Sequence, residues 1–143
     1  MSRTISLTVY CKPQPQGSTR AFTPKGWTRP IITSDNKGLK SFRQEVSKAA
    51  LLARQEAGAV DLIFGKHEPV EMVATFYFLR PPSIPKKRIC HVVKPDVSKL
   101  VRSAEDSLTG IIFADDAQIV RSHAEKHYGA PERVELTVRE FGL

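Results

Sequence analysis

Cysteine and long hydrophobic runs are both scarce in this chain of 143 residues. The two cysteines, Cys11 and Cys90, are too far apart for a metal or redox motif, so we expect free thiols in a reducing cytoplasm. No run approaches the roughly 20 apolar residues that span a bilayer. The first residues hold no apolar segment of the secretory type, and we expect no secretory signal. These absences exclude disulfide-rich and membrane-spanning classes.

Acidic residues are outnumbered: 22 Lys and Arg face 15 Asp and Glu, a formal net charge of +7. A basic small domain favours an anionic partner, most commonly nucleic acid. The alternative is a solvated surface that happens to be basic. No segment is typical of a basic amphipathic membrane anchor. The length predicts one domain over residues 1–143, because domains usually hold about 100–200 residues.

Hydrophobic periodicity predicts two helices and a small set of strands. Alternating residues predict strands over 4–10, 70–79, 118–128 and 133–141, and a short strand at 31–33. Apolar spacings of three and four predict helices from 39 to near 58 and from 97 to 108, the second capped by Asp96 and followed by Gly110. The expected class is α+β: a small mixed sheet with the two main helices on one face.

Acidic residues at two of these boundaries suggest a metal site. Asp96 lies at the start of the second helix, and Asp115 and Asp116 lie at the start of the following strand. If the helix doubles back along the sheet, these carboxylates can meet and hold Mg²⁺ or Mn²⁺. The alternatives are that Asp96 is a plain helix cap and that the acidic pair is a solvated turn.

Arg102 lies two turns after Asp96, on the helix face away from the apolar stripe, where its charge can approach a phosphate. Alternatively, Arg102 forms a surface ion pair with Glu105 or Asp106.

Two basic segments are candidates for DNA binding. One comprises Lys86, Lys87 and Arg88, and the other Arg20, Lys25 and Arg29 with Trp27 among them. Trp27 could stack on an unpaired base, although a tryptophan more often anchors its own loop. The first run could equally be a solvated loop.

His123, Glu125 and His127 alternate along one predicted strand. A zinc site would need further ligands, so we expect the solvent face of the strand instead.

The segment from Lys94 to Val120 resembles the RusA family of Holliday junction resolvases. Its pattern is an Asp-x-Asp at a helix start, a basic residue one turn later and a downstream Asp-Asp-Ala-Gln-Val. The matching residues here are Lys94-Pro95-Asp96-Val97, Leu100, Arg102, Asp106, Leu108 and Asp115-Asp116-Ala117-Gln118-Ile119-Val120. The stretch Gln16–Phe22 is similar to the basic N-terminal segment of many members.

The resemblance implies a small homodimeric endonuclease, Mg²⁺-dependent with Mn²⁺ as a possible substitute. Such an enzyme nicks two opposing strands of a four-way DNA junction during recombination and repair. Asp96 and Asp116 would be catalytic metal ligands, with Asp115 in support. Arg102 stands where the family often has a catalytic lysine. The implied location is the cytoplasm, for a protein of bacterial or phage origin.

One position departs from the family pattern: Ser98 replaces its second metal aspartate. A serine hydroxyl is a weak neutral ligand, so a metal site here would lose one charged ligand. The chain is therefore either an active resolvase or a catalytically inactive junction-binding protein of the same fold. A third class, an unrelated basic domain that binds RNA or another protein, would leave the acidic residues as caps and turns.

Overall fold

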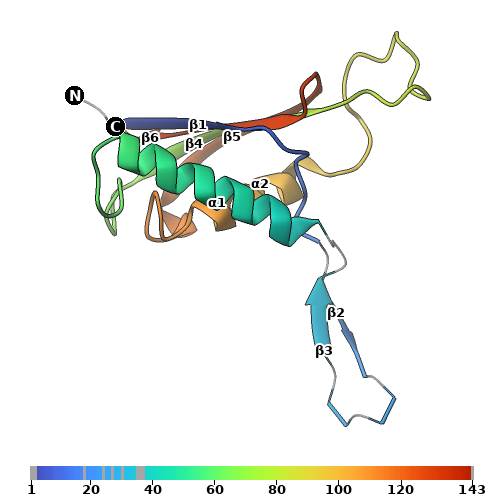
Figure 1. Cartoon of the computed structure of the whole chain (residues 1–143), viewed down its shortest axis with the longest axis horizontal. Coiled ribbons are helices and arrows are strands. Elements are labelled where there is room, and N and C mark those ends of the chain that lie inside the picture. Colours follow the sequence, from blue (N-terminus) through green and yellow to red (C-terminus); the bar gives the residue numbers. More distant parts are fainter. Residues whose placement is uncertain are drawn as a thin grey trace.

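The computed structural model describes residues 3–17, 19–23, 25–26, 28–29, 31–34 and 38–142, with backbone alone at 19–22 and 31–34 (Figure 1). Its elements in chain order are β1 (Thr4–Val9), β2 (Thr19–Phe22), β3 (Ile31–Ser34), α1 (Leu39–Glu56), β4 (Val70–Phe78), α2 (Val97–Leu108), the 3-10 turn η1 (Asp116–Gln118), β5 (Ile119–Tyr128) and β6 (Arg133–Glu140).

The main sheet has the strand order β1-β6-β4-β5. β6 pairs antiparallel with β1 and with β4, whereas β4 and β5 are parallel. Parallel neighbours need a crossover connection, and here α2 lies within it. The sheet is therefore mixed, as predicted.

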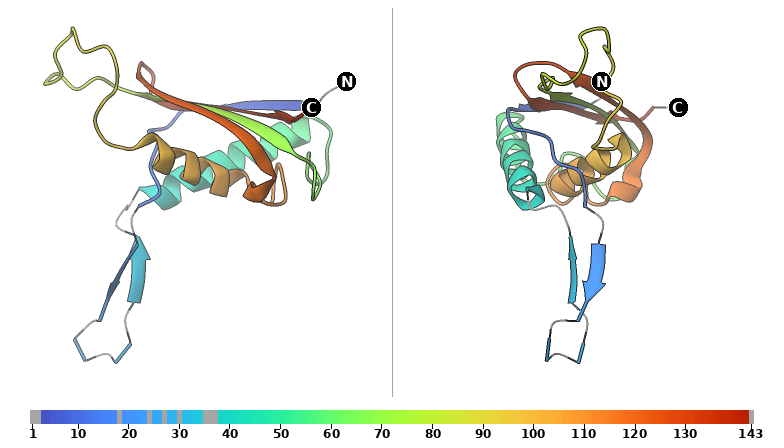
Figure 2. Two further views of the ribbon diagram at one scale, coloured as in Figure 1. Left: turned by 180° about the vertical axis from the view of Figure 1, so that it is seen from behind. Right: turned by 90° about the vertical axis from the view of Figure 1, so that its right-hand side faces the viewer.

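Both helices cover one face of this sheet (Figures 1 and 2). Every second residue of β4 from Val70 to Phe78 is buried, and the residues between them are only partly covered. The buried side chains of β1, β4, β6, α1 and α2 form one hydrophobic cluster. The predicted layering is confirmed, and the opposite face of the sheet carries polar and charged side chains.

Several boundaries differ from the expectations. The first strand ends at Val9, the second at Phe78 and the last at Glu140. The strand expected from Gln118 begins at Ile119, because Gln118 belongs to η1. The strand β2 was not expected at all.

The buried side of α2 also includes two polar residues that the apolar pattern missed. The Ser103 hydroxyl donates to the carbonyl oxygens of Gln14 (2.6 Å) and Leu100 (2.8 Å), and the Ser107 hydroxyl donates to that of Ser103 (2.7 Å). These bonds satisfy both hydroxyls inside the core and attach the chain after β1 to the helix.

Two segments project from the body. β2 and β3 form a separate antiparallel hairpin, and residues 79–96 form a long loop between β4 and α2. Figure 2 shows that both leave the body at the same end, where α2 begins. No helix among the described residues is long and apolar enough to cross a membrane.

Both cysteines are free: Cys11 is partly buried and Cys90 is exposed. Burial, and to a lesser extent the charge of Glu45, raises the pKa of the Cys11 thiol.

Candidate active site

A cleft of about 520 Å³ lies between α2 and η1, and we call it the acidic cleft. It is lined by Gln16, Gly17, Lys99, Arg102, Glu105, Asp106 and Asp116. Three carboxylates and two cations therefore share one polar hollow. Two of the residues named from the sequence, Arg102 and Asp116, lie in it together.

The cleft exists because the chain reverses immediately after α2. Gly110 adopts a φ of 84°, a left-handed conformation that favours glycine and ends helices. Its N–H donates to the carbonyl oxygen of Phe113 (2.7 Å), which closes a tight turn. Asp116 is thereby returned alongside the last turns of the helix.

Gln118 holds this returning segment in place. Its Oε1 accepts hydrogen bonds from the backbone N–H groups of Ala114 and Asp115, both at 2.8 Å. Its Nε2 donates to the carbonyl oxygens of Gly65 (2.8 Å) and Glu68 (3.0 Å). One buried amide thus fixes the backbone on which the acidic pair is mounted.

The two neighbouring aspartates have different roles. Asp115 caps η1, with its carboxylate accepting from the N–H of Ala117 (3.0 Å), and this bond and one with Asp116 lower its pKa. The side-chain hydrogen bond with Asp115, together with burial and the charge of Asp106, raises the pKa of Asp116. Asp116 is therefore the member of the pair that retains the proton longer and faces the cleft.

Glu105, which the sequence suggests only as an ion-pair partner of Arg102, also lines the cleft. Burial is the largest cause of its raised pKa, followed by the charges of Asp116 and Asp106, while Arg102 opposes them. Helical spacing could have indicated its place: Glu105 follows Ser98 by seven residues and Arg102 by three, so all three share one face.

Asp96 is at the N-cap position of α2, but its side chain makes no capping hydrogen bond, contrary to our expectation. It lies about 15 Å along the helix axis from Asp106, at a rise of about 1.5 Å per residue. Among the described residues that line the acidic cleft, Asp96 is absent.

Ser98 lines an adjoining hollow of about 400 Å³ with Arg102 and Glu105. Asp106 pairs with Arg43 of α1 (4.0 Å) rather than with Arg102.

The cleft offers some of the oxygen ligands that a hard cation such as Mg²⁺ needs. No three acidic, histidine or cysteine side chains within the described part of the chain lie close enough together to hold a metal ion. Mg²⁺, however, usually keeps several waters and binds through one or two carboxylates. Burial raises the pKa of Glu105 and the hydrogen bond with Asp115 raises that of Asp116, with smaller contributions from neighbouring carboxylates, and the buried Oε1 of Gln16 accepts no hydrogen bond from the described residues. An unpaired oxygen beside two such carboxylates fits a cation.

The basic segments lie on the two projections. Lys86, Lys87 and Arg88 are exposed on the 79–96 loop. Lys25 and Arg29 are exposed between β2 and β3, while Arg20 lies in β2 and its side chain is outside the described residues. Trp27 also lies outside them.

His123, Glu125 and His127 are exposed on β5, which confirms the solvent-face prediction. Glu125 accepts from both rings, at 2.8 Å from His123 Nε2 and 3.3 Å from His127 Nε2. These contacts, that of His123 first, lower the pKa of Glu125.

Comparison with known proteins adds two findings. The profile of the family described as Endodeoxyribonuclease RusA matches residues 11–139. A Bacillus subtilis (strain 168) protein named "Uncharacterized protein YqaN" is 30% identical over 146 residues, which cover 95% of this chain and 96% of that protein.

Proposed function

The chain belongs to the RusA family of endodeoxyribonucleases, and from this premise we propose that it is a Holliday junction resolvase. It would make paired, symmetric nicks in four-way DNA junctions during recombination and repair. We propose that it acts in the cytoplasm and is of bacterial or phage origin. The observation that carries this proposal is the acidic cleft, where the carboxylates of Glu105 and Asp116 lie beside Lys99 and Arg102.

RusA resolvases generally depend on a divalent metal, and we propose Mg²⁺, with Mn²⁺ as a substitute. Asp116 and Glu105 would hold the ion, with Gln16 as a neutral oxygen ligand. Glu105 would then supply the negative charge that the neutral Ser98 cannot give to the metal ion. Asp115 would support the site by holding η1. Asp96 would be a further ligand, although it does not line the cleft among the described residues. When bound, such an ion activates water and neutralises charge on the phosphate.

Arg102 and the DNA-binding segments have separate tasks. The Arg102 guanidinium, on the same wall as Glu105, would pair with the phosphate under attack. An arginine keeps its proton at any ordinary pH, so it would stabilise charge and not transfer a proton. Lys86, Lys87 and Arg88 on one projection, and Arg20, Lys25 and Arg29 on the other, would hold the arms of the junction.

Two equivalent strands must be cut, and a two-fold homodimer presents two equivalent clefts to them. We therefore propose self-association, which sedimentation of the free protein and of its junction complex would measure.

The second candidate function is junction binding without cleavage, which Ser98 favours. Family membership removes the third class considered above, an unrelated basic domain.

The test compares four-way junction, duplex and single-stranded DNA for binding and nicking, with and without Mg²⁺ or Mn²⁺. We expect selective binding and metal-dependent nicking of the junction, with nicking lost in Asp116→Asn. Binding without nicking supports the inactive protein, and absence of junction preference contradicts both candidates.

Substitutions on this face of α2 test which residues belong to the metal site. Ser98→Asp should raise nicking, whereas Glu105→Gln should lower it and also weaken Mn²⁺ binding measured directly by calorimetry. If Ser98→Asp changes nothing while Asp96→Asn abolishes cleavage, position 98 is not part of the metal site. Unchanged Mn²⁺ affinity in Glu105→Gln removes Glu105 from it.

A further inference from the structure

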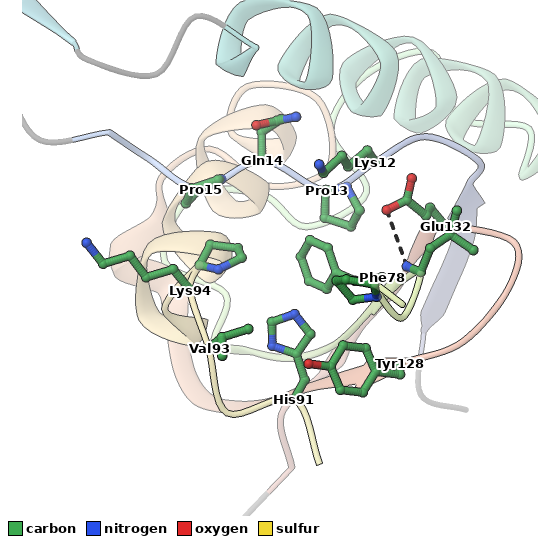
Figure 3. A pocket seen from close by; sticks show the side chains of 13 residues that line it. Lys12, Pro13, Gln14, Pro15, Phe78, His91, Val93, Lys94, Tyr128 and Glu132 are labelled. Atoms are coloured by element: carbon green, nitrogen blue, oxygen red, sulfur yellow. Dashed lines mark hydrogen bonds between the residues drawn. The ribbon is translucent and has the colours of Figure 1, made fainter. Parts of the chain in front are cut away.

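A second hollow, of about 360 Å³, lies near the start of α2 and has a different chemistry; we call it the His91 pocket. Its walls come from the segment after β1, the end of β4, residues 91–95 and the end of β5 (Figure 3). Sites for small organic groups usually measure about 300–1,000 Å³, so this pocket holds one ring system rather than a peptide.

Aromatic rings form one side of the pocket. The ring centroids of Phe78 and His91 are 4.8 Å apart, and those of His91 and Tyr128 are 4.7 Å apart. The guanidinium of Arg80 lies 4.8 Å from the Tyr128 centroid. Figure 3 shows the rings of Phe78, His91 and Tyr128 along one side of the pocket, with Pro13 next to Phe78. Flat aromatic rings are the surface on which nucleobases stack.

The opposite wall is held rigidly. The ammonium of Lys126, on β5, donates to the carbonyl oxygens of Val93 (2.6 Å) and Pro95 (2.9 Å). These bonds attach the 91–95 segment to the sheet, so the pocket is built before any ligand arrives.

Two polar atoms of the three rings find no hydrogen-bond partner among the described residues. They are Nδ1 of His91, a residue only 6% exposed, and the Tyr128 hydroxyl. Buried polar atoms nearly always find partners, so two orphans in one pocket point to a ligand that supplies them. Burial, then the charge of Lys126, lowers the pKa of His91.

The remaining charges select an anion. Lys12 and Lys94 are exposed and line the pocket, and they outnumber the Glu132 carboxylate, which accepts from the N–H of Leu79 (3.3 Å). The aromatic side and the two unpaired polar atoms suit a nucleobase, and the two ammonium groups suit a phosphate. Together they suit a nucleotide.

We propose that the His91 pocket binds an unpaired nucleobase of a DNA strand, with its phosphate on Lys12 and Lys94. This proposal adds a base-binding site to the proposed function. It rests on that function for the assumption that the bound strand is DNA. Lys94 lies two residues before Asp96, so the bound base would be next to the helix that lines the acidic cleft. In a four-way junction such a base would come from a pair that opens at the point where the strands exchange.

The test uses photocrosslinking of DNA that carries one 5-iodouracil. The base is placed at the crossover of a four-way junction, in the middle of one of its paired arms, or in a single-stranded oligonucleotide. We expect crosslinks to Phe78, His91 or Tyr128 from the crossover and single-strand positions, and none to these residues from the arm. Peptide mass spectrometry identifies the residue. Crosslinks only at other residues would overturn the pocket.

Binding of the single-stranded oligonucleotide by variants gives an independent measure. Val93→Trp fills the pocket and should weaken binding about tenfold, the scale of one lost base stack. Lys12→Ala with Lys94→Ala should weaken it and lower the salt dependence, whereas the matched control Lys48→Ala, exposed on α1, should not. Equal binding by all variants contradicts the proposal.

The two proposals fail separately. If the junction is neither preferred nor cut, the resolvase proposal fails, and the single-strand crosslink still decides the pocket. If junctions are cut while neither DNA crosslinks to the three rings, the pocket proposal fails alone.

Discussion

Gln118 shows how a single side chain can position a candidate active site. Its amide satisfies four backbone groups and is only 8% exposed. Sequence alternation placed it in a strand, because a local pattern does not reveal that a side chain will bond to residues fifty positions away.

The substitution Gln118→Ala removes the side-chain hydrogen bonds of four backbone groups, of which the Gly65 carbonyl alone is known to keep another partner, the N–H of Glu68. We expect the free energy of unfolding to fall by about 2–4 kcal/mol. Urea denaturation measures it, with Gln44→Ala, exposed on α1, as the control. A loss below about 1 kcal/mol would show that water replaces the amide.

Glu105 marks the limit of prediction at the same scale. Asp116 and Arg102 were identified from a motif, and both line the cleft. Helical spacing places Glu105 on the face of Arg102, but that Asp116 lies against this face depends on the tight turn at Gly110, whose direction the spacing does not reveal.

Across elements, Glu71 links three strands on the open face of the sheet. Its carboxylate on β4 contacts Arg139 of β6 (2.7 Å) and Arg121 of β5 (3.0 Å), and these bonds, that of Arg139 first, hold its pKa below the ordinary 4.5.

A lowered pKa in the folded state means that the ionised form is stabilised by folding. The contribution is fully present above pH 4.5 and is lost as the pH falls through the lower, folded value. Glu71→Gln should therefore have a lower melting temperature than the wild type at pH 7, and the two should converge in acid. Glu56→Gln, at the exposed end of α1, is the control. A gap independent of pH would contradict the electrostatic explanation.

The independence of the β2–β3 hairpin can also be tested, because among the described strands β2 and β3 pair with each other and not with the main sheet. Replacing residues 19–34 by a short Gly–Ser linker should leave the melting temperature within a few degrees. It should also lower junction affinity and reduce the salt slope by up to about 0.9 per lost phosphate contact. Loss of folding would show that the hairpin belongs to the core.

Long periodic elements were predictable and the hairpin was not. α1 and β4 are recognised because burial repeats every three to four or every two residues. β2 has four residues and follows a proline-containing segment, so there is little pattern to recognise. Its pairing partner, β3, lies beyond an intervening loop.

For the whole molecule, a net charge of +7 predicts binding dominated by phosphate contacts. Junction affinity should fall by orders of magnitude between low and high salt, with a linear log–log plot. Fluorescence anisotropy with a labelled junction measures this, and affinity that barely changes would exclude the electrostatic mode.

The tight turn at Gly110 has one more consequence. Arg102, Glu105 and Asp116 come from a single short stretch of chain, while the two basic projections are separate loops attached to the same body. Under the proposed function, most residues of the cleft and the basic side chains that would hold DNA are thus carried by different segments, except that Gln16 and Gly17 of the cleft lie just before β2. Exchanging the basic part of the 79–96 loop should then change which DNA shape is bound and leave the acidic cleft as it is.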